Sequence, residues 1–179
     1  MYECSNGSCS LITVDGTDCR IQEPSPFERK WYSHKYNKPG VRYKIGVCIQ
    51  TCKIVWVNGP YPCGAWPDIK IARHMLVHML DNGEQVVADG GYRDSTGVFT
   101  TPNGLNNADQ TMKQLARSCH EVVNRRLKQW GILCTMYRHH PSTHGRVFIA
   151  CSVITSLVLQ LDQPIFEIEY NDSVVDEWS

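Results

Sequence analysis

The feature that most constrains this fold is a segment in which every second residue is apolar. Over residues 41–49 the alternating positions hold Val41, Tyr43, Ile45, Val47 and Ile49. A period of two is the signature of a β-strand with one buried face. Residues 51–53 can turn the chain, and residues 54–57 return as a second apolar segment. The sequence therefore predicts a β-hairpin here, and the remaining elements must cover its apolar face.

Two short strands and one helix are predicted around this hairpin. Residues 11–14 form an apolar run that ends at Asp15-Gly16-Thr17, and residues 85–88 form another that ends at Asp89-Gly90-Gly91. Between them, Pro67 precedes apolar residues spaced by three and four, which predicts a helix over residues 67–81. A strand, a crossover helix and a second strand are typical of a parallel pair within a sheet.

The second half of the chain is expected to be mainly helical. Residues 92–107 are polar and contain glycine and proline, so we expect a loop there. A long amphipathic helix follows, with one apolar stripe formed by Met112, Leu115, Cys119, Val123, Leu127 and Trp130. Residues 147–161 are apolar and predicted to be helical, and residues 166–170 are a candidate late strand. The predicted fold class is α/β, a mixed sheet flanked by helices.

Composition excludes several classes of protein. Lys plus Arg and Asp plus Glu both number 18, so the net charge is zero and the chain is not a uniformly basic nucleic-acid binder. Nine cysteines, an odd number, do not suggest a secreted disulfide framework, and no signal peptide opens the sequence. We expect reduced thiols in an intracellular protein. No apolar run looks long enough to span a bilayer, so no membrane contact is expected.

Asp15 and Asp89 are the residues that point to chemistry. Each follows an apolar strand and precedes a glycine, and open α/β sheets place their sites beyond the carboxyl ends of strands. Two neighbouring carboxylates repel each other unless they share a proton or bind a cation. Oxygen ligands select Mg²⁺ or Mn²⁺. The alternative is that both aspartates simply form turns with their glycines.

Glu121 is the candidate for a third carboxylate, which would let the site hold two metal ions. It lies off the apolar stripe of the long helix, on a face that also carries Arg117 and Arg125. The alternative is an ordinary surface pair, because Glu121 and Arg125 are four residues apart.

Four blocks of sequence resemble the PIF/Harbinger-type transposases and their DDE superfamily endonuclease relatives. They occur in the family's order and cover residues 13–170. They are Asp15-Gly16-Thr17 with Trp31-Tyr32-Ser33-His34-Lys35 and Pro39-Gly40-Val41-Arg42-Tyr43; the run from Gly59 to Asp68; Ala88-Asp89-Gly90-Gly91-Tyr92; and the run from His120 to Trp130. Asp18 departs from the family pattern, which often has histidine there, so Asp18 is either a group close to the site or a turn residue.

The resemblance implies an RNase H-like mixed five-stranded sheet and a triad of Asp15, Asp89 and Glu121 that is both catalytic and metal-binding. It also implies that the protein binds two Mg²⁺ or Mn²⁺ ions and hydrolyses and transfers DNA phosphodiester bonds. From it we further expect a nuclear location, a Myb-like DNA-binding partner and a homo-oligomer. The catalytic domain would span residues 11–170, with a short extension over residues 1–10 and a tail over residues 171–179. Transposases of this family carry a DNA-binding region before the catalytic domain. The alternative is therefore a truncated or domesticated remnant that binds DNA or a partner protein without catalysis.

Several other features have a functional and a structural interpretation. A basic set could contact phosphates or form a solvated helix face; its members are Arg117, Arg125, Arg126, Lys128 and Arg138. Zinc could be held by Cys134 with His139, His140 and His144, or by His74 and His78, although neither spacing fits a known motif. Asp68 is either a carboxylate near the site or a first-turn acid that favours the helix dipole. Trp31 and Tyr32 either stack on an unpaired base or pack within the protein.

Overall fold

The computed structural model describes residues 9–81, 84–88, 92, 98–100 and 107–161. Its centre is a mixed sheet whose main strands are β1 (Cys9–Arg20), β3 (Lys38–Cys48), β4 (Ile54–Pro62), β5 (Glu84–Val87) and β6 (Phe99–Thr100). The two-residue β2 (Tyr32–Ser33) adds a short pairing to the start of β3. Four helices and two short 3₁₀ turns complete the described chain: α1 (Asp68–Met75), α2 (Asn107–Lys128), α3 (Gly131–Cys134), α4 (Pro141–Gln160), η1 (Arg29–Trp31) and η2 (Val77–Met79).

The sheet combines antiparallel and parallel pairs. β3 pairs antiparallel with β1 on one edge and with β4 on the other, and β1 pairs parallel with β5, which pairs parallel with β6. The predicted hairpin is therefore confirmed as β3 and β4. The predicted mixed α/β class is also confirmed, because α1 connects the antiparallel half of the sheet to the parallel half.

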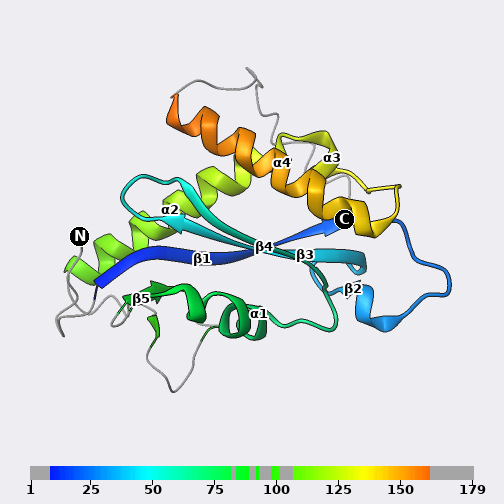
Figure 1. Ribbon diagram of the computed structural model, residues 1–179, viewed down its shortest axis with the longest axis horizontal. Helices are drawn as coiled ribbons and strands as arrows, with labels where there is room; N and C mark the ends of the chain where they lie inside the picture. Colours follow the sequence, from blue (N-terminus) through cyan, green and yellow to red (C-terminus); the bar gives the residue numbers. More distant parts are fainter. Residues whose placement is uncertain (1–8, 82–83, 89–91, 93–97, 101–106, 162–179) are drawn as a thin grey trace.

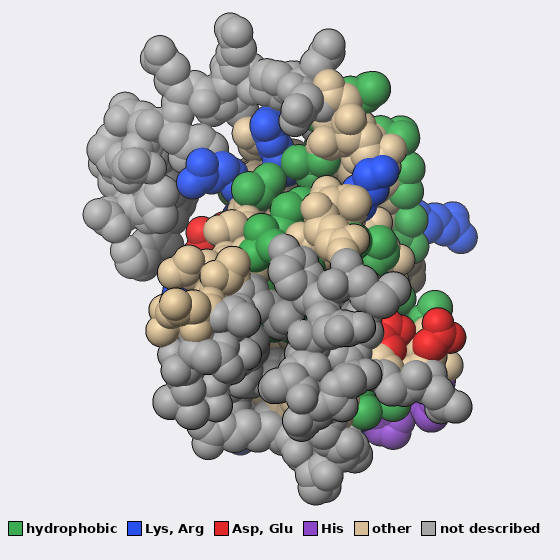
Figure 2. Space-filling view, turned by 90° about the vertical axis from the view of Figure 1, so that its left-hand side faces the viewer, with side chains coloured by type: hydrophobic (Ala, Val, Ile, Leu, Met, Phe, Trp, Pro, Cys, Tyr) green, Lys and Arg blue, Asp and Glu red, His purple; other side chains and the backbone are tan. Residues whose placement is uncertain are grey.

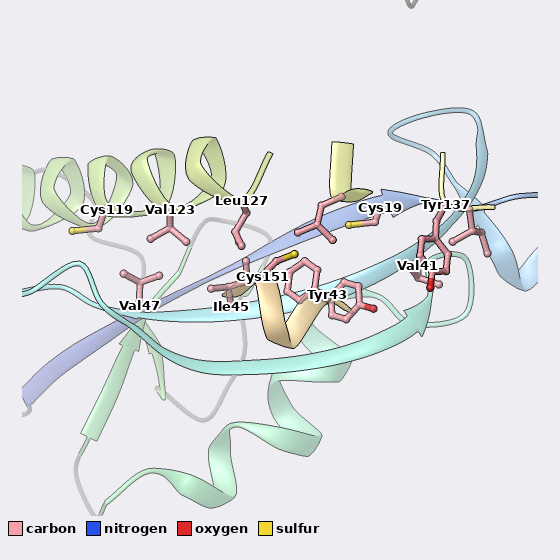
Figure 3. Close-up of a cluster of buried hydrophobic side chains, with 13 residues drawn as sticks. Cys19, Val41, Tyr43, Ile45, Val47, Cys119, Val123, Leu127, Tyr137 and Cys151 are labelled. Atoms are coloured by element: carbon pink, nitrogen blue, oxygen red, sulfur yellow. The ribbon is translucent and has the colours of Figure 1, made fainter. Parts of the chain in front are cut away.

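Helices cover both faces of this sheet. In Figure 1, α2 and α4 lie above the strands, and α1 lies below them beside β5. The larger core lies on the α2 side, where Cys119, Val123 and Leu127 point from α2 toward Val47 and Ile45 of β3 (Figure 3). These α2 residues belong to the predicted apolar stripe, so the amphipathic pattern correctly identified the buried face of the helix.

Helix α4 closes the other end of the same core. Phe148, which is fully buried, stacks on Tyr43 with their ring centroids 3.7 Å apart. The helix begins at Pro141, where the side chain of His140 accepts a hydrogen bond from the backbone N–H of Ser142 at 3.3 Å. The sequence predicted a helix from residue 147, and the cap explains why it starts earlier.

The outward face of α4 is apolar, which differs from our expectation. By length and composition α4 could cross a membrane, with 28% of its most apolar window buried, whereas the sequence suggested no such run. Core helices of globular proteins meet the same criteria, so this finding establishes nothing further. Its exposed large apolar side chains include Ile149, Val153 and Leu157, which lie four residues apart, and Ile154; Leu161, just after the helix, is exposed as well.

Three other expectations were wrong in detail. A disulfide joins Cys52, in the β3–β4 turn, to Cys119 of α2, where we expected only reduced thiols. Residues 99–100 form β6 inside the segment predicted as loop, because two residues are too few to show a periodic pattern. The helix predicted over residues 67–81 ends at Met75 and is followed by η2. The candidate late strand at residues 166–170 lies outside the described residues.

Candidate active site

Asp15 lies in the middle of β1, not at its carboxyl end as the sequence suggested. The strand continues to Arg20 because β3 pairs with it as far as Gly40. Residues Thr13, Asp15 and Thr17 lie opposite Val47, Ile45 and Tyr43 in the register, and all three of these β3 residues belong to the core under α2. The Asp15 side chain is half-buried, and its Oδ1 accepts a hydrogen bond from the N–H of Gly16 at 2.7 Å. Asp15 therefore belongs to the face of the sheet that α2 covers.

Asp89 lies outside the described residues, but the strand before it is well defined. β5 runs parallel to β1, and Val87, its last residue, pairs with Thr13. In the sequence, Asp15 and Asp89 each come two residues after this pair. The predicted parallel pair that leads to both aspartates is confirmed.

Glu121 lies on α2 with its side chain in solvent. The side chain is 70% exposed, and its Oε1 lies 3.5 Å from Nε of Arg117, four residues earlier. The sequence suggested a surface pair with Arg125, but the structure pairs Glu121 with Arg117. An exposed pair of this kind contributes about 0.2–1 kcal/mol, so little free energy holds the carboxylate in this position.

His120 is a buried residue of α2 within electrostatic range of Asp15, and we assigned it no role from the sequence. The side chain is only 7% exposed, and neither ring nitrogen has a hydrogen-bond partner in the described part of the chain. Burial lowers the pKa of His120, while the carboxylate of Asp15 and the backbone of Thr13 act in the opposite direction. Although the Thr13 backbone affects the pKa of the ring, it does not form a hydrogen bond with either ring nitrogen of His120. Within the described chain, the imidazole is thus buried on the side of the sheet that carries Asp15, with both nitrogens unpaired.

An ion pair between a buried lysine and a partly exposed aspartate lies on the opposite face of the sheet, directly behind the Asp15-Gly16-Thr17 segment. Lys44 is fully buried, and its Nζ lies 2.6 Å from Oδ1 of Asp68 at the start of α1. The same ammonium group donates a hydrogen bond to the hydroxyl of Tyr92. Burial lowers the pKa of Lys44, and the Asp68 carboxylate partly restores it. Lys44 thereby links β3, α1 and the residue that follows the Asp89-Gly90-Gly91 segment.

This ion pair explains the glycine after Asp15. A Cβ atom on Gly16 would lie 2.7 Å from Nζ of Lys44 and 2.8 Å from Oδ1 of Asp68. Both distances are far below ordinary van der Waals contact, so β1 can approach the pair this closely only without a side chain. The Asp15-Gly16 motif therefore has a packing reason in addition to any chemical one.

Asp18 and Asp68 are joined to the same network through Arg42. The carboxylate of Asp18 accepts hydrogen bonds from Nε and Nη2 of Arg42 at 2.7 and 3.0 Å, and from the Ser33 hydroxyl at 2.7 Å. Burial alone would raise the pKa of Asp18, but these hydrogen bonds hold it below its ordinary value. Nε of Arg42 also lies 3.6 Å from Oδ1 of Asp68. Asp18 is thus a buried anchor of β1, and the turn interpretation was wrong.

The basic set lies on α2 and just beyond it. Arg117, Arg125, Lys128 and Arg138 are exposed, and Arg126 is half-buried. On the end of the molecule that Figure 2 shows, Lys and Arg side chains occur as separate groups among hydrophobic and uncharged side chains. Positive charge on this face is therefore distributed and does not form one concentrated patch.

The histidines and cysteine considered for zinc do not come together. No group of three metal-binding side chains occurs among the residues that the structure describes. His144 is fully buried and its Nδ1 lies 2.7 Å from the Tyr43 hydroxyl, while burial lowers its pKa to about 4. His140 caps α4, as described above. Trp31 packs against the core, and Tyr32 donates a hydrogen bond to Asn37 at 3.1 Å, which is consistent with packing roles.

The described residues supply two donor groups that fit a divalent cation. The Asp15 carboxylate offers oxygen, and His120 offers a buried nitrogen with no partner within the described ranges. A cation at this position would satisfy polar atoms that are otherwise costly to bury. The Lys44 ammonium, on the other face, cannot serve as a ligand because it carries no free electron pair.

Sequence reasoning found the acidic residues but missed the partners that surround them. Lys44 and Arg42 alternate with the apolar residues of β3, and this pattern gave no sign that α1 would cover their face as well. His120 adjoins the apolar stripe of α2, three residues before Val123. Its spacing on the helix could have indicated burial before the structure was known.

Comparison with known protein families identifies the family to which the chain is similar. The family model described as DDE superfamily endonuclease matches residues 14–156. No curated protein and no solved structure shows significant similarity to the chain. The matched region begins at the residue before Asp15 and includes Glu121, as well as every strand and helix described after β1 except the last four residues of α4.

Proposed function

Because the chain belongs to the DDE superfamily endonuclease family, we propose that it is a metal-dependent DNA endonuclease and strand transferase of the PIF/Harbinger type. The observation that carries this proposal is the family match over residues 14–156, which contains all the candidate acidic residues. The strand order supports an RNase H-like fold, because β4, β3 and β1 form an antiparallel half and β5 and β6 extend it in parallel.

Asp15, Asp89 and Glu121 would hold two Mg²⁺ or Mn²⁺ ions. The parallel register supports the convergence of the two aspartates, since both follow the paired residues Thr13 and Val87 by two positions. Glu121 belongs to the helix that covers the Asp15 face of β1. Its carboxylate would exchange the exposed contact with Arg117 for the cation, at the small cost expected for a surface pair.

When bound, such ions activate an attacking oxygen and stabilise the leaving oxygen of a phosphodiester. The protein would contribute position and charge: its strands hold the aspartates, and the core under α2 keeps the helix in place. Arg117, Arg125, Arg126, Lys128 and Arg138 would contact DNA phosphates, so that affinity falls as salt rises. A nuclear location, a Myb-like DNA-binding partner and a homo-oligomer are parts of this proposal that rest on the resemblance alone.

Nicking of supercoiled plasmid DNA in the presence of Mn²⁺ tests the proposal. We expect Asp15→Asn, Asp89→Asn and Glu121→Gln each to abolish nicking while the far-ultraviolet circular dichroism spectrum stays unchanged. Glu23→Gln is the matched control, because Glu23 is an exposed acid outside the site, and it should nick like the parent protein. Unchanged nicking by the Asp89 variant would end the assignment, and unchanged nicking by the Glu121 variant would leave Glu121 as a surface residue.

A second candidate is a remnant that binds DNA or a partner protein without cutting. The exposed position of Glu121, paired with Arg117, is compatible with either function, so an experiment has to separate them. Calorimetric titration with Mn²⁺ distinguishes the two functions. A remnant would bind DNA in a gel-shift assay but would bind no Mn²⁺ and nick no plasmid.

A further inference from the structure

The side chain of His120 is the least explained polar group in the described part of the molecule. It is 7% exposed and lies on α2 between the disulfide-bonded Cys119 and Glu121. Both Nδ1 and Nε2 are enclosed without a hydrogen-bond partner among the described residues. Leaving a buried polar atom unsatisfied is costly because the group loses its hydrogen bonds to water, so native proteins rarely do so without a functional reason.

The position of His120 on the helix directs the ring toward the sheet. The buried positions of α2 are Ala116, Cys119, His120, Val123 and Leu127, which follow one another at helical spacing. His120 is therefore part of the face that packs on β1 and β3. Glu121, one residue later, is rotated by about 100° around the helix axis, which agrees with its 70% exposed side chain.

Asp15 is the charged group that acts most strongly on His120. Its carboxylate favours a positive charge on the ring and so acts against burial on the pKa of His120, while Lys44 has a smaller effect in the opposite direction. Thr13, whose backbone also acts on the ring, and Asp15 lie on the same face of β1 because they are two residues apart in a strand. The imidazole and the carboxylate thus lie on the same side of the sheet, where α2 packs on it, with the imidazole buried and the carboxylate half-buried.

We propose that His120 is a ligand of the divalent cation that Asp15 binds, so that the site contains one nitrogen donor from α2 in addition to carboxylate oxygens. The neutral imidazole would coordinate the ion through one of its two nitrogens, neither of which has a hydrogen-bond partner among the described residues. This inference rests on the proposed metal-dependent function and deepens it. It assigns a metal ligand to α2 at the residue next to Glu121.

A nitrogen ligand changes which ion the site prefers. Mg²⁺ takes oxygen ligands and sheds its water reluctantly. Imidazole suits transition metals, and Mn²⁺ accepts a mixed oxygen and nitrogen set more readily than Mg²⁺ does. A site with His120 as a ligand should therefore bind Mn²⁺ more tightly than Mg²⁺, and the preference should fall when the imidazole is removed.

Pulsed electron paramagnetic resonance of the full chain loaded with Mn²⁺ alone tests the ligand directly. A coordinated imidazole couples its ¹⁴N nucleus to the Mn²⁺ spin, and ¹⁵N-histidine labelling should replace that signal without any mutation. We expect the coupling in the parent protein and in His78→Ala, an exposed histidine used as control. We expect its loss in His120→Ala and His120→Asn, with Mn²⁺ affinity lowered about 10-fold or more by calorimetry.

The outcomes separate this inference from the proposed function. Stoichiometric Mn²⁺ binding without histidine coupling, or coupling that survives in a folded His120 variant, would refute the His120 ligand and leave the nuclease proposal standing. If the folded parent protein bound no Mn²⁺ at all, both would fall. The labelled parent protein gives its answer even if neither His120 variant folds.

Discussion

Replacing Asp68 by Asn should expose how much the buried Lys44 depends on its carboxylate. Nζ of Lys44 lies 2.6 Å from Oδ1 of Asp68, and the lysine side chain is 0% exposed. The substitution keeps the shape of residue 68 but removes its charge. The ammonium group would then remain buried with the Tyr92 hydroxyl and a neutral amide as its neighbours.

The loss of unfolding free energy has an upper limit, which is the cost of deprotonating the lysine. A buried lysine without a counter-ion can lose its proton, and at pH 7, which is 3.5 pH units below the ordinary pKa of 10.5, this costs about 5 kcal/mol. Breaking a fully buried pair by removing one partner typically costs about 3–5 kcal/mol. The side chain of Asp68 is 43% exposed, so solvent screens part of this interaction. We therefore expect Asp68→Asn to lower the free energy of unfolding by about 2–4 kcal/mol at pH 7.

The loss should become smaller as the pH rises. The pKa of Lys44 is lowered in the folded state, so the unfolded chain binds more protons between that lowered pKa and 10.5. Stability associated with this group consequently increases with pH across that range. At pH 9, the upper limit for the Asp68→Asn penalty falls to about 2 kcal/mol, since each pH unit corresponds to about 1.4 kcal/mol.

Urea unfolding of the parent and Asp68→Asn proteins at pH 7 and pH 9 measures both quantities. Asp81→Asn serves as control, because Asp81 is exposed and should change stability by less than about 0.5 kcal/mol. In a Lys44→Met background the Asp68 substitution should cost little, since the ammonium group is gone. A penalty below about 1 kcal/mol at pH 7, or one that does not shrink at pH 9, would refute this account of the buried pair.

Three further perturbations follow from packing and covalent structure. Gly16→Ala should lower the free energy of unfolding by about 1–3 kcal/mol, because the added Cβ would lie 2.7 Å from the enclosed Lys44 ammonium. Gly131→Ala should be neutral in the same urea titration, because a Cβ at Gly131 would meet no atom within 4 Å. Reduction of the Cys52–Cys119 disulfide, which spans 67 residues, should lower the free energy of unfolding by up to about 4 kcal/mol. The stability of the Cys52→Ser variant should not respond to dithiothreitol, because the disulfide is already absent. The Cys134→Ser variant, which loses a free cysteine, should respond as the parent protein does. Leu127 is 3% exposed, so Leu127→Ala should lower the free energy of unfolding by about 2–5 kcal/mol in thermal or urea unfolding. Leu157 is 52% exposed, so Leu157→Ala should change that free energy little. Equal effects of the two substitutions would contradict the assigned core.

Local patterns in the sequence identified the main elements because each element has its own period. The alternation over residues 41–49 identified β3, and the stripe through Cys119, Val123 and Leu127 identified α2 and its buried face. Asp15 was recognised as a candidate because it follows an apolar run, although it lies within β1 and not at its end. The extent of β1 depends on pairing with β3 over residues 40–48, which is a long-range property.

By itself, the sequence determined the mixed α/β class, the hairpin, the crossover to β5, the long amphipathic helix and the acidic candidates, because these depend on spacing along the chain. Only the tertiary structure decided what surrounds those acids. The burial of Lys44 against Asp68, the anchoring of Asp18 by Arg42 and the enclosure of His120 beside Asp15 each join residues from different elements. Such contacts depend on how helices cover both faces of the sheet, and periodicity within one segment carries no information about the element that will cover it.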